Sequence, residues 1–167
     1  NLVSNENTII GNTVLYGATS GKLFAGGQAG DRFAVRNSGA TTVIEGCDSN
    51  GCEYMTGGTV VILGDVGDNF AAGMTGGMAF IYDKSKEFIK KVNPESVIWQ
   101  NVETEYWINF LKNLVSEHTK ETKSIISKNI ISNFDQEIKN FVQVCPKEMI
   151  GKLQNPITFK SNVKEVS

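Results

Sequence analysis

A hydroxyl-bearing residue followed by glycine recurs four times in the first half of this chain. The copies are Ser20-Gly21, Ser38-Gly39, Thr56-Gly57 and Thr75-Gly76, spaced 18, 18 and 19 residues apart with apolar stretches between them. A fixed period of this size is typical of a solenoid, in which each repeat forms one coil stacked on its neighbours. Such a coil is usually a scaffold, so the repeat lowers the expectation of chemistry in this chain.

The segments between the glycines are short and rich in residues that favour β-strands. We expect strands at 13–16, 22–25, 32–35, 41–44, 53–55, 59–63, 69–72 and 78–82. Strands this short are not stable alone, so successive coils must pair in parallel. The predicted fold is mainly β: a right-handed, single-stranded parallel β-helix of about four coils, followed by a C-terminal α-helical appendage.

We assign a structural role to the glycines at the corners of this coil, because tight corners need positive φ and leave no room for a side chain. The corner glycines are Gly21, Gly39, Gly57, Gly58, Gly76 and Gly77. We assign no catalytic, cofactor-binding or metal-binding residue. Neither G-x-G-x-x-G nor a phosphate loop occurs, which argues against a nucleotide site. Asp31 and Asp68 match in the repeat, which suggests turn capping through the carboxylate.

Two of the three cysteines, Cys47 and Cys52, form a C-x₄-C pair. A zinc site normally needs four ligands in two such pairs, so the signal for a metal is weak. Counting back four residues from each hydroxyl–glycine pair aligns Cys52 with Tyr16, Ala34 and Ala71. A small apolar side chain would pack inside the coil at this position, and we interpret the cysteine as a packing residue.

Composition changes near Asp83. Sixteen of the 17 glycines lie in residues 1–83, which carry a net charge of −5, whereas residues 84–167 carry +3. We therefore predict a glycine-rich β-helix over 1–83 that is incomplete at its N-terminal end, a helical appendage over 84–154 and a flexible tail over 155–167. The chain begins at Asn1 rather than Met, which suggests a portion of something longer.

Charge, hydropathy and cysteine content exclude several classes of protein. The overall charge of −2 argues against non-specific nucleic-acid binding. No run of about 18 apolar residues is present, so we expect no membrane span. Three cysteines do not resemble a secreted disulfide framework, which favours a cytoplasmic location.

The apolar pattern changes to a helical period from Thr104 onward. One helix face is formed by Tyr106, Trp107, Phe110, Leu111, Leu114, Val115 and His118. A second helical stretch places on one side Ile126, Ile130, Phe134, Ile138 and Phe141. His118 is the only histidine, and we interpret it as structural because no catalytic partner for it is evident.

Several stretches together resemble one known family. They are GNTVLYGATSG at 11–21, AGDRFAVRNSGA at 29–40, EGCDSNGCEYMTGG at 45–58 and GDNFAAGMTGG at 67–77. The tail adds Leu114-Val115-x-x-His118 and the run Phe141–Pro146. Over about residues 9–154 the chain is similar to the C-terminal GXGXG β-helix domain of the glutamate synthase large (alpha) subunit.

The resemblance implies a non-catalytic scaffold within a larger enzyme. That enzyme makes L-glutamate from glutamine and 2-oxoglutarate, using an amidotransferase domain and an FMN-binding synthase domain with an iron–sulfur cluster. The implied partners are those domains, with the small subunit left open, and no cofactor is implied in this chain. Two alternatives remain: a subunit or stand-alone module related to the β-helix subunit of formylmethanofuran dehydrogenase, and a cofactor-binding enzyme in its own right.

The first coil has a consequence for stability. The family domain usually has further coils before the Gly11 region, so this coil would present an unpaired parallel edge. Unpaired backbone groups and exposed apolar side chains on that edge are both costly. We expect the piece alone to be marginally stable or self-associating.

Overall fold

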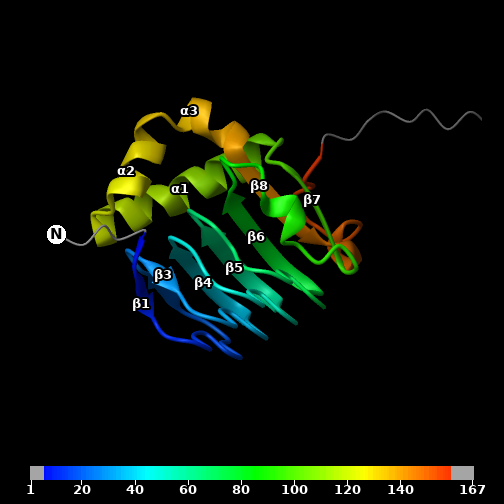
Figure 1. Cartoon of the computed structure of the whole chain (residues 1–167). Helices are drawn as coiled ribbons and strands as arrows, with labels where there is room; N and C mark the ends of the chain where they lie inside the picture. The colour runs from blue at the N-terminus through cyan, green and yellow to red at the C-terminus, as the bar shows by residue number, and fades with distance from the viewer. Residues whose placement is uncertain (1–5, 159–167) are drawn as a thin grey trace, which may run out of the picture.

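The computed structural model describes residues 6–158 (Figure 1). Its strands are β1 (Thr8–Ile10), β2 (Lys22–Phe24), β3 (Gln28–Ala29), β4 (Ser38–Ile44), β5 (Thr56–Ile62), β6 (Gly76–Tyr82), β7 (Val97–Asn101) and β8 (Phe141–Pro146). Its α-helices are α1 (Glu105–Thr122), α2 (Ile125–Ser132) and α3 (Phe134–Glu137). Short 3-10 turns lie at Phe88–Lys90, Ile138–Asn140 and Lys147–Met149.

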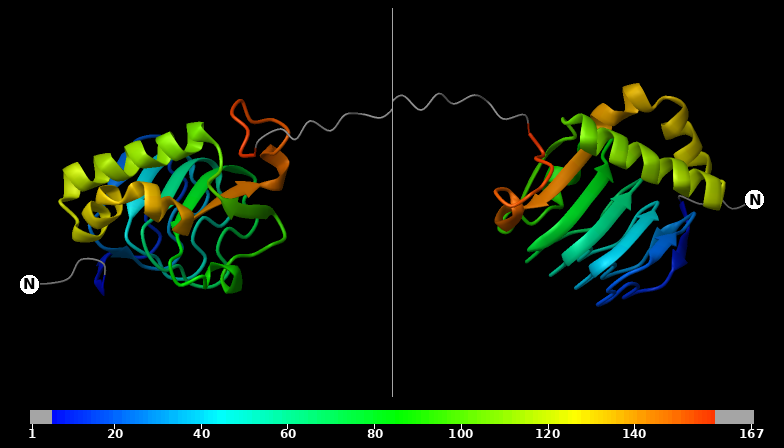
Figure 2. Two further views of the ribbon diagram at one scale, coloured as in Figure 1. Left: turned by 90° about the horizontal axis from the view of Figure 1, so that it is seen from above. Right: turned by 180° about the vertical axis from the view of Figure 1, so that it is seen from behind.

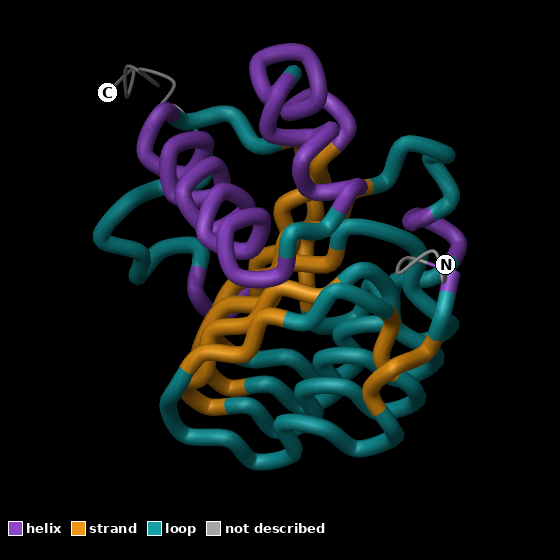
Figure 3. Tube along the Cα trace, turned by 90° about the vertical axis from the view of Figure 1, so that its left-hand side faces the viewer, coloured by secondary structure: helices purple, strands orange, loops and turns teal. Residues whose placement is uncertain are grey.

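The main sheet has six strands in the order β2-β4-β5-β6-β8-β7. The first four are parallel, one from each coil, and β8 and β7 then add in antiparallel fashion. A second side of the coil begins with β1 paired to β3 and continues through bridges from Ala29 to Cys47 and from Cys47 to Val66. The prediction of a mainly β solenoid of about four turns with helices after it is confirmed (Figure 3).

The third side of each coil is not a strand, so the strands expected at 13–16, 32–35, 53–55 and 69–72 are wrong. Every second residue there has φ between +54° and +65°, in three columns: Thr13, Arg32, Asn50, Asn69; Leu15, Ala34, Cys52, Ala71; and Gly17, Arg36, Tyr54, Gly73. We call these segments the left-handed ladder. Their amides still bond from coil to coil; the Cys52 amide donates to the Phe33 carbonyl at 2.8 Å.

The ladder corrects the expected alignment of Cys52 in the first coil. The Ala34 amide donates to the Val14 carbonyl at 2.9 Å, which stacks Leu15, and not Tyr16, beneath Ala34. Tyr16 is instead 54% exposed. The other part of the expectation is confirmed, because Ala34, Cys52 and Ala71 are fully buried in the coil interior.

Two hydrophobic cores lie on opposite faces of the main sheet. Alternation along the strands points one set of side chains into the coil, as with Ile44 and Ile62. The other set, which includes Val61 and Phe80, packs against the apolar face of α1 around Leu111. The helices therefore lie along one side of the coil stack (Figure 2).

The second half differs in part from its prediction. Helix α1 follows Thr104 as expected, but strands β7 and β8 were not anticipated. Phe141, expected on a helix face, is instead the first residue of β8. β8 is buried along its whole length and covers the last parallel strand, β6. The helical region thus also closes the C-terminal end of the sheet.

The described part of the expected tail is anchored to the rest of the fold. The Gln100 side-chain amide donates to the Ile157 carbonyl at 2.8 Å, and the Trp107 indole donates to the Asn155 carbonyl at 3.0 Å. The Ile157 side chain is buried. The remainder of the tail, 159–167, lies outside the described residues. Within residues 6–158, no helix has the length and apolar character that crossing a membrane requires.

Candidate functional site

The predicted corner glycines lie at the first positions of the parallel strands or just before them. At three of them an added Cβ would collide with a backbone oxygen of the preceding coil: Gly39 with Thr19 at 2.1 Å, Gly57 with Ser38 at 2.2 Å and Gly76 with Thr56 at 2.0 Å. Gly58 and Gly77 combine close contacts with φ of +83° and +79°. Gly21 has φ of +97° but open space around it. The six glycines thus fall into three groups: three are required by close approach alone, Gly21 by left-handed backbone alone, and Gly58 and Gly77 by both.

The three cysteines are free thiols in buried positions. Burial, reinforced by the nearby Asp48 carboxylate, raises the pKa of Cys47 to about 12. Burial also raises the pKa of Cys52 well above its usual value. An iron–sulfur cluster generally takes four cysteine ligands. The chain has three cysteines, and Cys47 and Cys52 lie inside the coil whereas Cys145 lies in the core on the opposite face of the sheet, so they do not form such a ligand set. Across residues 6–158, no group of three or more His, Cys, Asp or Glu side chains is placed to hold a metal ion.

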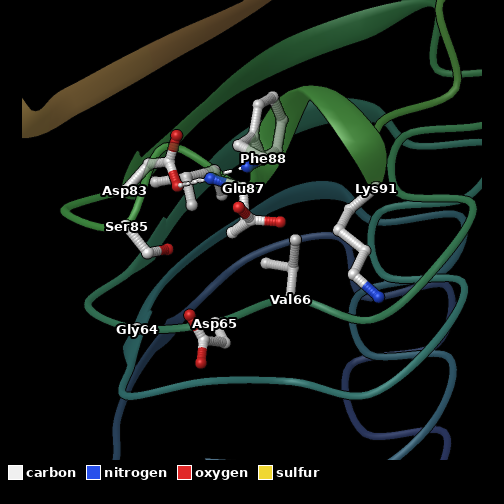
Figure 4. A pocket seen from close by; sticks show the side chains of 9 residues that line it. Gly64, Asp65, Val66, Asp83, Ser85, Glu87, Phe88 and Lys91 are labelled. Atoms are coloured by element: carbon white, nitrogen blue, oxygen red, sulfur yellow. Dashed lines mark hydrogen bonds between the residues drawn. The ribbon is translucent and has the colours of Figure 1, made fainter.

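A pocket of about 410 Å³ opens beside the last coil (Figure 4). At least two of its charged side chains are already used within the fold. The Asp83 carboxylate accepts hydrogen bonds from the amides of Glu87 and Phe88 at 3.0 and 3.2 Å. Lys91 pairs with Asp68 at 2.8 Å. The lining consists of Gly64, Asp65, Val66, Ile81, Asp83, Ser85, Glu87, Phe88 and Lys91. These contacts fasten the 88–90 turn to the coil.

The two aspartates that match in the repeat have different partners. The Asp31 carboxylate bonds across coils instead of capping its own turn, because it accepts the Ser49 amide of the next coil at 3.1 Å. Asp68 instead binds the Lys91 side chain. On the left-handed ladder, the side-chain amide of Asn69 donates to the side-chain oxygen of Asn50 at 3.1 Å. Polar side chains on this side thus link one coil to the next.

The most unusual chemistry is a buried polar cluster between the coil and the helices. Glu45 follows Val43 in the strand alternation, so its side chain faces α1, and it is 1% exposed. Its carboxylate lies 3.6 Å from Nε2 of His118, which is fully buried. The Ser124 hydroxyl, at the start of α2, donates to the same carboxylate oxygen. We call Glu45, His118 and Ser124 the interface cluster.

The interface cluster is not arranged as a catalytic triad. In a triad the histidine lies between the serine and the carboxylate, whereas here the serine donates to the carboxylate directly. All three side chains are also buried. The cluster joins the end of a coil strand, at Glu45, to helix α1 and the start of α2, so it can hold the helices on the coil. The sequence pattern shows no partner for His118 and does not single out Glu45. The signal that could have found it was strand alternation, which puts this carboxylate on the face that the helices must cover.

Comparison with known proteins identifies relatives across nearly the whole chain. The family model described as "GXGXG motif" matches residues 1–147. The "Glutamate synthase [NADPH] large chain" of Azospirillum brasilense is 61% identical over 93% of this chain and 10% of its own length. The protein of the same name from Bacillus subtilis is 47% identical over 88% of this chain and 10% of its own length. The chloroplastic "Ferredoxin-dependent glutamate synthase" of Spinacia oleracea is 51% identical over 83% of this chain and 9% of its own length. The chain thus spans about a tenth of the length of these curated relatives.

Proposed function

This chain belongs to the GXGXG-motif family, and on that basis we propose that it forms the coiled scaffold domain of a glutamate synthase large chain. The use of its polar groups supports a structural role. The carboxylate of Glu45 and the imidazole of His118 lie between the coil and the helices, and Asp83 fastens a turn. The relatives match both the coil and the helical part, which favours this domain over a stand-alone β-helix subunit.

In this proposal the chemistry belongs to the rest of the large chain. The whole enzyme would form L-glutamate from glutamine and 2-oxoglutarate in the cytoplasm, with FMN and an iron–sulfur cluster bound by other domains. The scaffold would contact the amidotransferase and FMN-binding synthase domains, and the small subunit is a further candidate partner. None of its own residues would touch a reacting atom.

The close approach of Gly57 to the Ser38 carbonyl provides the test. In the full-length enzyme, we expect Gly57→Val to reduce the yield of folded, assembled protein. Glutamine hydrolysis and glutamate formation should fall together with that yield, and the folded fraction should keep its turnover. Gly11→Val is the matched control, because nothing lies within 4 Å of a Cβ there. A Gly57→Val enzyme that folds normally and loses only its chemical step would refute the scaffold role.

A further inference from the structure

We propose that one bare side of the coil is a docking surface for an acidic segment of another domain of the same large chain. This surface, the tyrosine–arginine face, consists of Tyr16, Arg36, Tyr54 and Gly73. The inference rests on the proposed function, because it takes the remainder of the large chain as the partner.

The tyrosine–arginine face is continuous from coil to coil. The Gly17 amide donates to the Val35 carbonyl at 2.9 Å, which places Tyr16 beside the Val35–Arg36 rung. The Tyr54 amide donates to the Ala72 carbonyl at 2.8 Å, and the Tyr54 ring lies against Gly73, where an added Cβ would be 2.5 Å from the ring. Arg36 lies on the coil between that of Tyr16 and that of Tyr54, since its own backbone amide donates to the Glu53 carbonyl.

The backbone makes this face rigid. Arg36, Tyr54 and Gly73 all belong to the left-handed ladder, with φ of +55°, +54° and +64°. Backbone hydrogen bonds join each rung to the rungs beside it, so the Cα atoms that carry the outward side chains are held in place. A rigid surface loses little conformational entropy when a partner binds.

The composition of the face is that of a binding surface. Tyr16 and Tyr54 are 54% and 53% exposed. Tyrosine and arginine are enriched at protein interfaces and supply much of the binding energy there. The main-sheet side of the coil is covered by α1 and its neighbours, whereas no helix among residues 6–158 lies over the left-handed ladder (Figure 3).

Charge indicates the chemistry of the partner. The chain has two arginines, Arg32 and Arg36, and both lie on the left-handed ladder. Within residues 6–158 neither takes part in an ion pair, whereas Lys22 and Lys91 do. A guanidinium presents a planar fork of donors that matches a carboxylate in two hydrogen bonds. Asp or Glu side chains on the partner would therefore complement Arg36.

The length of the relatives indicates where that partner lies. About nine-tenths of each relative's length is outside the region that this chain matches, so most of a large chain is available to cover a bare face. A segment of the same polypeptide also has a high effective concentration, which favours it over a separate partner.

Tyrosine labelling of the full-length large chain, purified without other subunits, tests this directly. Tyr106 on α1 is the internal reference, since its exposure of 48% is close to that of Tyr16 and Tyr54. Hydroxyl-radical footprinting should label Tyr16 and Tyr54 at least about tenfold more slowly than Tyr106, because an interface core excludes solvent. Equal labelling of all three tyrosines would overturn the proposal.

Two variants of the full-length chain separate docking from general burial. Arg36→Glu should restore fast labelling of Tyr16 and Tyr54, whereas Arg32→Glu should not. Arg32 is a matched control, because it is exposed and has nearly the same φ, +58° against +55°. Protection that survives Arg36→Glu would overturn the docking surface. Protection that appears only with the small subunit, or that grows with protein concentration, would overturn the proposed occupant. Either failure leaves the scaffold role untouched, since Gly57→Val tests that role separately.

Discussion

Ten residues other than glycine hold a left-handed backbone on the ladder of this coil. Each such residue costs about 1–2 kcal/mol relative to its preferred conformation. Cys52 and Ala71 accept this cost at positions where their amides donate to the coil below at 2.8 and 2.9 Å. The strain therefore persists because the stacked coils impose the geometry on every rung. It follows that glycines in this fold differ in importance, according to whether strain, contact or both exclude a side chain.

Three glycine-to-alanine variants separate these contributions. Gly58→Ala should destabilise most, since it combines φ of +83° with a Cβ 2.4 Å from the Ala40 carbonyl oxygen. Gly21→Ala should cost about 1–2 kcal/mol from backbone strain alone. Gly11→Ala should be nearly neutral, because its site is open and carries no positive φ. Denaturant unfolding at fixed protein concentration measures the order. If Gly21→Ala proved as damaging as Gly58→Ala, close approach would not be the main reason for glycine at these corners.

The buried thiols give stability a dependence on alkaline pH. Burial raises the folded-state pKa of Cys47 from 9.0 to about 12, so the folded state disfavours its thiolate. This contribution is fully present below pH 9 and is lost as pH rises from there toward 12, because the unfolded thiol ionises first. We expect Cys47→Ala to lose less stability between pH 8 and pH 11 than the unmodified chain, measured by denaturant midpoint. An identical decline in both proteins would contradict this origin.

At the scale of the element, local signals predicted the repeating strands and the long helix. The strands expected at 41–44 and 59–63 coincide with the later parts of β4 and β5, and Thr104 precedes α1 as the helical period indicated. Both strands begin three residues earlier than expected, at hydroxyl–glycine pairs that we assigned to corners. The run Phe141–Pro146 was missed because a strand buried on both faces shows no alternation. The 32–35 segment was assigned as a strand because Phe and Val favour sheets, yet that propensity reflects packing and does not determine φ.

Local sequence signals could not predict the interface cluster, because Glu45 and His118 belong to elements that only the tertiary fold brings together. Its contribution to helix docking can be measured. Removing one member of a buried polar contact leaves the other without its partner, which typically costs about 1–3 kcal/mol. His118→Ala should therefore destabilise strongly, and combining it with Glu45→Gln should recover part of the loss.

A double-mutant cycle by denaturant unfolding gives the coupling between the two sites. Near-additive losses from Glu45→Gln and His118→Ala would show that the two side chains do not act as a unit. A hydroxyl control completes the set: Ser124→Ala removes the donor to Glu45 but leaves the imidazole in place, so its effect should be smaller than that of His118→Ala.

At the scale of the whole molecule, the two ends of the coil stack differ. The end near β6 is closed by β8 and by the turn carrying Phe88. The Phe88 ring packs edge-on against Phe70, with 5.7 Å between the ring centroids. The opposite end carries β1 and β2, and among the described residues no strand pairs with the outer edge of either. Ile9 on this edge is 56% exposed. An unpaired parallel edge with an exposed apolar side chain is a template for another chain.

We therefore expect the chain alone to self-associate through its first coil, and Ile9→Lys to weaken that association, because a charged side chain blocks edge pairing. Ile89→Lys is the matched control: Ile89 is 65% exposed but lies at the closed end, so its replacement should leave association unchanged. Sedimentation velocity over a range of concentrations distinguishes the two variants. A chain that stays monomeric at high concentration and melts cooperatively would contradict the expectation. Equal effects of the two lysines would place the contact elsewhere than the open edge.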